Sequence, residues 1–293
     1  MTPGPPASPH LAPVVGADWL AQHAADPDLV LADVRWYLDG RSGRAAYDAG
    51  HLPGAVFVDL DAWLAGDPGA GRGRNPLPEP AVFARGMSVL GIGDASTVLA
   101  YDDAGGVIAA RLVWMLRALG REAALLDGGL LSPDVLAVAG PVTTAVAPCP
   151  EASFTAQPWP AELLADLGDV APGSRAAGTV VVDARPADRF RGAVADVDVR
   201  AGHVPGAVNV PCREHLDASG RLVGVPRLRD RFDAAGATAD AVAAGRVVVM
   251  CGSGVTACHD LLAMELAGLG RARLHPGSWS QYAATSLPVA TGG

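Results

Sequence analysis

The chain has 293 residues, of which half are hydrophobic and 18% are charged, and its formal net charge is −9 at pH 7. This length predicts about two domains, and the apolar content allows each of them to bury a core. The acidic balance and the lack of any Lys/Arg run argue against nucleic-acid binding. No apolar run approaches the roughly 18 residues that span a bilayer. Residues 1–20 also lack the pattern of a signal peptide, so we expect a cytoplasmic protein that does not contact membranes.

In the first half of the chain, apolar runs alternate with helical segments. The run Leu29–Ala32 ends in Asp33-Val-Arg35. A His-x-Pro-Gly-Ala turn at His51 follows, and then the short β-rich stretch Val56–Val58. The longer run Thr97–Tyr101 leads into a helical segment that ends at a Leu-Gly pair. Such alternation predicts a parallel sheet with helices on both faces.

The second half repeats this order. The segment AGHLPGA at 49–55 returns as AGHVPGA at 201–207. Asp183-Ala-Arg185 closes a second short apolar run, and Val247–Met250 matches the longer one. A repeat of about 150 residues indicates a duplicated domain. We therefore predict an N-terminal domain at 11–140, a linker rich in Pro, Ala and Thr at 141–153, and a C-terminal domain at 154–290.

In a parallel sheet of this kind, ligands bind at the carboxyl ends of the strands. Asp33, Asp183 and Cys251 are all predicted at such ends, and Asp102 stands in the first half where Cys251 stands in the second. The chemistry is therefore expected after the strand that ends at Met250.

Cys251 precedes a loop of Gly252, Ser253, Gly254, Val255 and Thr256. Successive N–H groups in such a turn form a nest for an anion, and a helix N-terminus adds partial positive charge. Both effects favour a thiolate at Cys251. A cysteine at a strand end can also be a small buried hydrophobic residue. The glycine-rich loop favours a nucleophile, because a core position does not need it.

The other cysteines lack this setting. Cys149 lies in the linker, Cys212 follows a strand-like run, and Cys258 occupies an apolar position of the next helix. The four cysteines show neither CxxC spacing nor a matching His pair, so we expect free thiols in a reducing compartment and no metal. A cysteine phosphatase would need a guanidinium six residues after its nucleophile. That position is Ala257, which argues against a phosphatase.

Over residues 11–290, the chain resembles the tandem-domain sulfurtransferases of the rhodanese family. The resemblance rests on the Cys251–Ala257 loop, the two His-x-Pro-Gly-Ala turns, Asp183-Ala-Arg185 and Gly277-Ser278-Trp279. It implies two rhodanese-like domains, of which only the C-terminal one forms a persulfide on its cysteine. Neither a metal nor an organic cofactor is implied.

The resemblance also implies a donor and a set of site residues. A Cys-Gly-Ser-Gly-Val-Thr loop is similar to that of the 3-mercaptopyruvate sulfurtransferases, in which the loop serine belongs to a Ser-His-Asp arrangement. Carried over, these residues are Ser253, His51 and Asp33, while Arg189 would hold the substrate carboxylate. Gly252, Gly254, Val255 and Thr256 would line the substrate site.

This chain departs from the pattern in one respect. The usual second arginine before the second His-x-Pro-Gly turn is not at its place. Either Arg200, the only basic residue of this segment, substitutes for it, or the second substrate arginine is missing. The stretch GRNPLP at 73–78 resembles a family segment with Asn75 in the place of a histidine.

Structural roles compete with these functional ones. His203 and Asp183 are interpreted as braces of turns, and Asp33 could also only brace the following loop through Arg35. His51 could be a brace or a catalytic group, and Trp279 could lie in the core or at the rim of the site. Three functions remain: transfer of sulfur from 3-mercaptopyruvate to a thiol, a thioredoxin-like protein or cyanide; the same transfer from thiosulfate; and a non-catalytic persulfide carrier.

Overall fold

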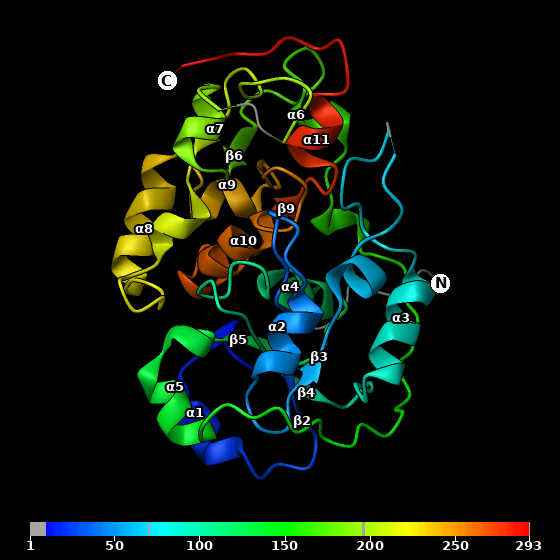
Figure 1. The fold of residues 1–293 in the computed structure, drawn as a ribbon. Helices are drawn as coiled ribbons and strands as arrows, with labels where there is room; N and C mark the ends of the chain where they lie inside the picture. The colour runs from blue at the N-terminus through cyan, green and yellow to red at the C-terminus, as the bar shows by residue number, and fades with distance from the viewer. Residues whose placement is uncertain (1–9, 70, 195–196, 293) are drawn as a thin grey trace. The chain divides into compact units, whose positions relative to one another are not determined.

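The structure is a computed structural model that describes residues 10–69, 71–194 and 197–292. The chain divides into two compact units (Figure 1). The N-terminal unit contains Met1–Gly66, Pro78–Pro160 and Leu216–Leu222. The C-terminal unit contains Asp67–Leu77, Ala161–His215 and Val223–Gly293. Among the residues placed in the structure, no helix has the length and apolar character that a membrane crossing requires.

The N-terminal unit is built on a five-stranded sheet in the order β1-β5-β4-β2-β3, with every pair parallel. Its strands are β1 (Val14–Val15), β2 (Leu29–Asp33), β3 (Val56–Phe57), β4 (Thr97–Tyr101) and β5 (Ala123–Leu126). Its helices are α1 (Ala17–His23), α2 (Gly43–Ala49), η1 (Leu60–Leu64), α3 (Pro80–Val89), α4 (Ala110–Ala118), η2 (Gly129–Leu131) and α5 (Pro133–Ala139).

The C-terminal unit has a four-stranded parallel sheet in the order β7-β6-β8-β9. Its strands are β6 (Val180–Asp183), β7 (Val208–Asn209), β8 (Val247–Met250) and β9 (Arg273–Leu274). Its helices are η3 (Ala161–Leu163), α6 (Leu167–Val170), α7 (Ala187–Arg191), η4 (Cys212–His215), α8 (Val225–Ala234), α9 (Ala239–Ala243), α10 (Ala257–Leu266) and α11 (Ser278–Tyr282).

The two sheets share one topology. The order β3-β2-β4-β5 in the first matches β7-β6-β8-β9 in the second, and Asp33 pairs with Phe57 as Asp183 pairs with Asn209. A single parallel bridge between Leu164 and Leu274 takes the place of the β1–β5 pair. The duplication predicted from the sequence is therefore confirmed at the level of strand order and register.

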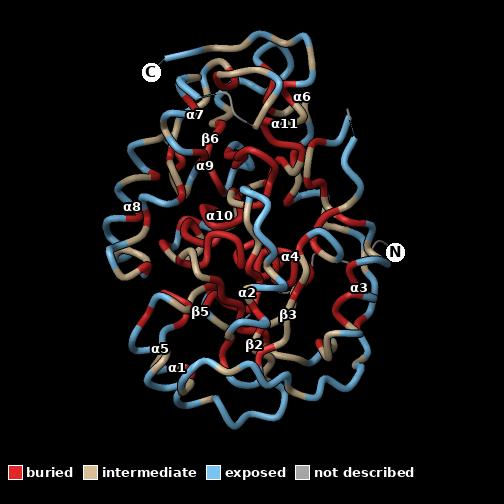
Figure 2. Tube along the Cα trace, viewed as in Figure 1, coloured by how far each residue is buried: buried red, intermediate tan, exposed pale blue. Residues whose placement is uncertain are grey.

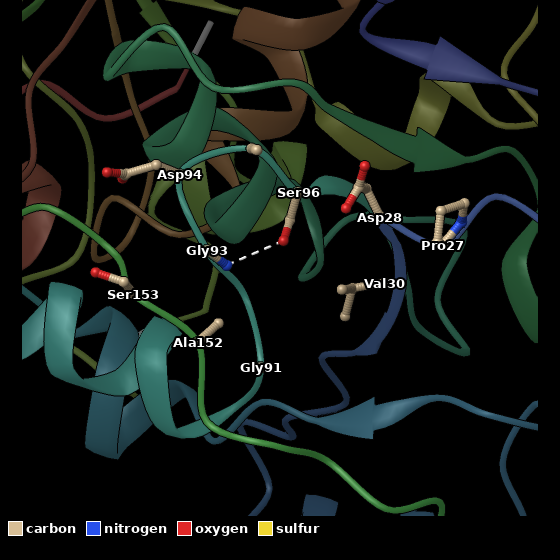
Figure 3. Close-up of a pocket in the computed structure, with 10 residues that line it drawn as sticks. Pro27, Asp28, Val30, Gly91, Gly93, Asp94, Ser96, Ala152 and Ser153 are labelled. Carbon is tan, nitrogen blue, oxygen red and sulfur yellow. Dashed lines mark hydrogen bonds between the residues drawn. The ribbon is translucent and has the colours of Figure 1, made fainter.

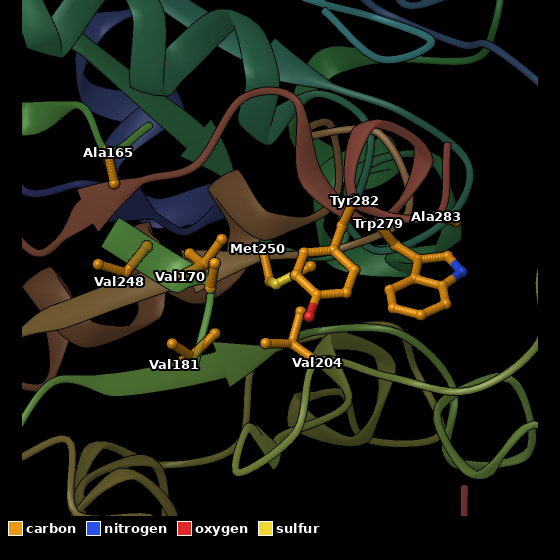
Figure 4. Packing of buried hydrophobic residues seen from close by; sticks show 10 residues of the cluster. Ala165, Val170, Val181, Val204, Val248, Met250, Trp279, Tyr282 and Ala283 are labelled. Carbon is orange, nitrogen blue, oxygen red and sulfur yellow. The ribbon is translucent and has the colours of Figure 1, made fainter. Parts of the chain in front are cut away.

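Each sheet is buried between helices, as runs of β-branched and aliphatic residues require. In the N-terminal unit, α1 and α5 pack on Leu99 and Tyr101. In the C-terminal unit, α6 and α11 pack on Val181, Val248 and Met250, with Trp279 and Tyr282 filling the space (Figure 4). The strands β4, β5 and β8 and the helices α4 and α10 are largely buried (Figure 2). Trp279 is fully buried, so it belongs to the core.

The units are not simple consecutive blocks. The segment Asp67–Leu77 joins the C-terminal unit, since the Gln281 amide donates to the Gly71 carbonyl and the Arg74 N–H donates to the Ser280 hydroxyl. Leu216–Leu222 joins the N-terminal unit through a hydrogen bond from Leu222 N to Asp127. The domain boundaries predicted at 140 and 154 include neither of these two segments in the unit that it joins. Local composition does not report contacts between residues this distant in sequence.

Candidate active site

Cys251 directly follows the last residue of β8 and is 1% exposed. Its backbone N–H donates to the Ser278 hydroxyl at 3.1 Å, and its carbonyl accepts from Trp279 N at 2.9 Å. The carbonyl of Gly252 accepts from Ser280 N at 2.9 Å. The start of α11 therefore fixes the backbone of Cys251 and Gly252.

The Cys251 sulfur lies within the turn that precedes α10. Its Sγ accepts a hydrogen bond from Gly254 N at 3.1 Å. The N–H groups of Gly252, Ser253, Val255 and Thr256 donate to no residue that the structure describes, so they are available to a bound anion. The loop thus presents unpaired donors at the start of a ten-residue helix, which favours negative charge at the sulfur.

The shape of this loop requires a glycine at position 254. Gly254 has φ +81°, and a Cβ atom there would lie 2.5 Å from the Pro276 carbonyl oxygen. The opposing segment is itself unusual, because Ser278 has φ +50° and is completely buried. The Ser278 hydroxyl donates to the His275 carbonyl at 2.8 Å while it accepts from Cys251. These contacts explain why Gly277-Ser278-Trp279 accompanies the cysteine loop.

Two guanidinium groups lie over Gly252. From the position that a Cβ atom on Gly252 would occupy, Arg74 Nη2 is 3.2 Å away and both Nη atoms of Arg189 are 3.9 Å away. Asp198 accepts from Arg74 Nη1 at 2.5 Å and from Arg189 Nη2 at 2.7 Å. Arg189 was predicted at the site, whereas Arg74 and Asp198 were missed. The only sequence signal for Arg74 was the family resemblance of the stretch 73–78.

Arg200 does not act as the second substrate-binding arginine. Its three guanidinium nitrogens donate to the carbonyls of Ala283, Leu287 and Tyr282 at 2.9, 2.9 and 3.2 Å. The side chain therefore braces the chain after α11. The prediction that Arg200 binds substrate is corrected, because its hydrogen-bonding capacity serves the backbone.

Ser253 fits the predicted role of a polar group at the site. It is 8% exposed, and its hydroxyl forms no hydrogen bond with the described part of the chain. Val255 is buried in the loop, and Thr256 is the N-cap residue of α10, without a hydrogen bond from its side chain to the helix. A hydroxyl without a protein partner beside the nucleophile can hydrogen-bond a substrate thiol or carbonyl.

Asp33 and His51 do not form the predicted pair. The Asp33 carboxylate accepts from the Arg35 guanidinium at 2.7 to 3.2 Å and is fully buried. The His51 ring faces the carbonyl oxygens of Tyr47 and Ala145 with Nδ1 and Nε2, at 2.8 and 3.2 Å. Both residues are thus engaged within the N-terminal unit, so the hydrogen bond between them that a relay needs is not formed.

The same arrangement occurs in the C-terminal unit. Arg185 binds the Asp183 carboxylate through Nε and Nη2, and Nη2 donates onward to the Gly202 carbonyl, as Arg35 does to that of Gly50. His203 bonds the carbonyl of Phe190 and stacks on its ring at 3.7 Å, the distance at which His51 stacks on Tyr47. Identical contacts in both halves identify these groups as braces.

The remaining cysteines offer no second nucleophile. All four are free thiols. Burial raises the pKa of the Cys149 thiol and that of the Cys212 thiol. Cys258 is buried in α10 and donates to the Gly254 carbonyl at 3.4 Å. Within the described ranges, no group of three or more His, Cys, Asp or Glu side chains could hold a metal ion.

A cavity in the N-terminal unit lies at the edge of the sheet where the strands β2 and β4 begin. This cavity of about 470 Å³ is lined by Asp28 and Val30 at the start of β2 and by Ser96 just before β4 (Figure 3). Ligands of parallel α/β sheets bind at the carboxyl ends of the strands, where Asp102 and Cys251 lie. The cavity is therefore not the site.

Comparison with known proteins agrees with this geometry. The rhodanese-like domain matches the chain twice, at residues 16–132 and 162–285. The chain belongs to the rhodanese family. A probable 3-mercaptopyruvate sulfurtransferase of Pseudomonas aeruginosa is 38% identical over 96% of this chain and 99% of its own. A putative thiosulfate sulfurtransferase of Mycobacterium tuberculosis is 39% identical over 92% of this chain and 93% of its own.

Solved structures of this family confirm the fold. The crystal structure of SseA from Escherichia coli, a 3-mercaptopyruvate sulfotransferase, superposes with a TM-score of 0.76 at 34% identity, covering 92% of this chain and 99% of the other. The predicted pair of rhodanese-like domains with parallel sheets is thereby confirmed.

The two loop glycines predict different outcomes on substitution. Gly254→Ala places a Cβ against the Pro276 carbonyl at a positive φ, so we expect about 1–3 kcal/mol lower stability. Gly252→Ala meets only the terminal nitrogens of Arg74 and Arg189 and no backbone atom, so we expect a stability loss below about 0.5 kcal/mol but about tenfold lower kcat/KM for the sulfur donor. Urea unfolding and steady-state assays separate them. Equal stability losses in Gly254→Ala and Gly252→Ala would contradict this prediction.

Replacing Asp33 tests its role as a brace. Asp33→Asn weakens a buried, charge-assisted contact with Arg35, so we expect about 2 kcal/mol lower unfolding free energy. Because Asp33 does not bond His51, kcat should stay within about twofold of the wild type. Asp183→Asn is the matched variant for the stability change. A fall in kcat by orders of magnitude in Asp33→Asn, with an unchanged unfolding free energy, would instead support the catalytic arrangement of Ser253, His51 and Asp33.

Proposed function

We propose that this protein is a sulfurtransferase that takes sulfur from 3-mercaptopyruvate onto Cys251 and passes it to a thiol or to cyanide. The observation that carries the proposal is a buried thiol that accepts from a loop N–H and is followed by Gly252, over which two guanidinium groups lie. The 3-mercaptopyruvate sulfurtransferases among its relatives support the donor. The family resemblance and the geometry thus point to the same residue.

In the first half-reaction, the Cys251 thiolate attacks the sulfur of the donor. The carbon–sulfur bond breaks, its electron pair stays on carbon as the enolate of pyruvate, and an S–S bond forms at Cys251. The proton of the donor thiol then moves to this carbon, which leaves pyruvate and a persulfide anion. The free N–H groups of the loop and the N-terminus of α10 stabilise that anion.

In the second half-reaction, a nucleophile attacks the outer sulfur. Cyanide leaves as thiocyanate, and a small thiol or a thioredoxin-like protein leaves as a persulfide. In each case the S–S bond electrons return to the Cys251 sulfur, so the thiolate is restored for another cycle. The four free cysteines suit a reducing compartment, and the cytoplasm is the proposed location.

Arg74 and Arg189 supply the charge that a carboxylate donor needs. A guanidinium presents two parallel N–H groups that match a carboxylate, and two of them can hold a carboxylate and the adjacent carbonyl. Their position over Gly252 places this anchor at the residue that follows Cys251. Ser253, whose hydroxyl has no partner among the described residues, would bond the donor thiol or carbonyl.

Thiosulfate is the second candidate donor. The relative from Mycobacterium tuberculosis that is named for thiosulfate is as similar to this chain as those named for 3-mercaptopyruvate. Two guanidinium groups can also bind a dianion. A persulfide carrier without turnover is the third candidate, and it would show a single sulfur transfer in the absence of a protein partner.

Mass spectrometry of the intact protein tests the nucleophile. After incubation with 3-mercaptopyruvate, Cys251 should gain one sulfur atom, which cyanide removes. Cys251→Ser should lose this mass and all steady-state activity, whereas Cys149→Ser, which alters an exposed thiol, should keep both. Retained turnover in Cys251→Ser would refute the mechanism, and turnover favouring thiosulfate in kcat/KM would overturn the donor.

Two arginine variants test whether Arg74 and Arg189, here called the clamp, hold the donor. Arg74→Gln removes a guanidinium beside Gly252, so we expect the KM for 3-mercaptopyruvate to rise and kcat/KM to fall about 10- to 100-fold. Arg200→Gln removes an equal charge that serves backbone carbonyls, so it should lower the melting temperature and leave kcat/KM within about threefold. Equal losses of kcat/KM in both variants would return Arg200 to the substrate site.

A further inference from the structure

One carboxylate lies between the two arginines of the site. Asp198 uses Oδ1 for Arg74 Nη1 and Oδ2 for Arg189 Nη2, and its side chain is only 5% exposed. The other terminal nitrogen of Arg74, Nη2, is the atom nearest to the Cβ position of Gly252. Asp198 therefore bridges the two guanidinium groups, and Arg74 Nη2 remains next to the loop at Gly252.

The neighbouring charged groups are committed elsewhere. Arg185 is paired with the buried Asp183 carboxylate at 2.7 Å. Arg200 serves three backbone carbonyls after α11. Asp198 is thus the acidic group seen in direct contact with the clamp in the described part of the chain. Its charge lowers the positive charge of the clamp by one unit at a place shielded from water.

We infer that Asp198 is a positioning and selectivity residue that sets the preference of the clamp for a singly charged donor over a doubly charged one. This inference rests on the proposed sulfurtransferase function. 3-Mercaptopyruvate presents one carboxylate, whereas thiosulfate carries two negative charges. Repulsion from Asp198 acts about twice as strongly on the dianion, because the interaction is proportional to the charge of the ligand. Low exposure limits the screening of this repulsion by salt.

Charge and positioning make separable predictions. Loss of positioning would impair both donors, since the guanidinium groups would lose their fixed geometry. Loss of the negative charge would favour thiosulfate more than 3-mercaptopyruvate. The ratio of the two kcat/KM values therefore reports the charge of Asp198 alone, and the common change in both values reports its positioning.

The test uses the whole chain and both donors with cyanide as the acceptor. Asp198→Asn keeps the shape of the side chain and removes its charge. We expect the ratio of kcat/KM for thiosulfate to that for 3-mercaptopyruvate to rise about tenfold over the wild type. Asp233→Asn is the matched control, because it removes an acid that pairs with Arg229 on an exposed helix face and should leave the ratio unchanged. Melting temperatures show that each variant is folded.

The double variant Arg74→Gln/Asp198→Asn restores the original net charge without restoring the ion pair. Its ratio of kcat/KM for thiosulfate to that for 3-mercaptopyruvate should return towards the wild-type ratio, although both kcat/KM values fall. An unchanged ratio in Asp198→Asn, or an equal fall for both donors, would overturn the inference. If the wild type turns over neither donor, the proposed function fails instead, so the two failures are distinguishable.

Discussion

The loop after the central strand of each sheet gathers backbone N–H groups around one point, and these donors require negative charge. In the N-terminal unit, the Asp102 carboxylate meets that need. Its two oxygens accept from Ala104, Gly106, Ile108 and Ala109 at 2.7 to 2.9 Å. Burial raises the pKa of Asp102, and these four donors act in the opposite direction. A covalently attached anion therefore fills the first loop.

The C-terminal unit meets the same requirement only in part. Cys251 Sγ receives one backbone N–H, and the neighbouring donors face no acceptor in the described chain. A persulfide or a substrate anion can complete what a fixed carboxylate completes in the other unit. The two halves thus differ mainly in the group inside the loop. It is a carboxylate in the N-terminal unit and a sulfur that takes up charge during the reaction in the C-terminal unit. Under the proposed function, this difference accounts for catalysis in the C-terminal copy alone.

The strands, the duplication and Cys251 could be predicted because their signals are local. Apolar runs, repeated turns and a glycine-rich loop lie within a few residues of the features they specify. Arg74 and Asp198 could not be found in this way, since their contact joins segments 124 residues apart. Arg200 was misread because its partners are backbone carbonyls, which the sequence does not mark. The role of His51 stayed open because a histidine that braces a turn and one that relays a proton have the same letter.

The separation between loop and clamp has a consequence for how donors are chosen. The loop stabilises negative charge on sulfur whatever the donor, because its donors are backbone groups held by Gly254 and Ser278. The clamp, by contrast, is made of side chains whose charges can be changed without disturbing the strand or the turn. Relatives named for two different donors can therefore match this one chain at nearly the same identity, 38% and 39%. Selection between a carboxylate and thiosulfate then depends on the balance of Arg74, Arg189 and Asp198 rather than on the cysteine itself.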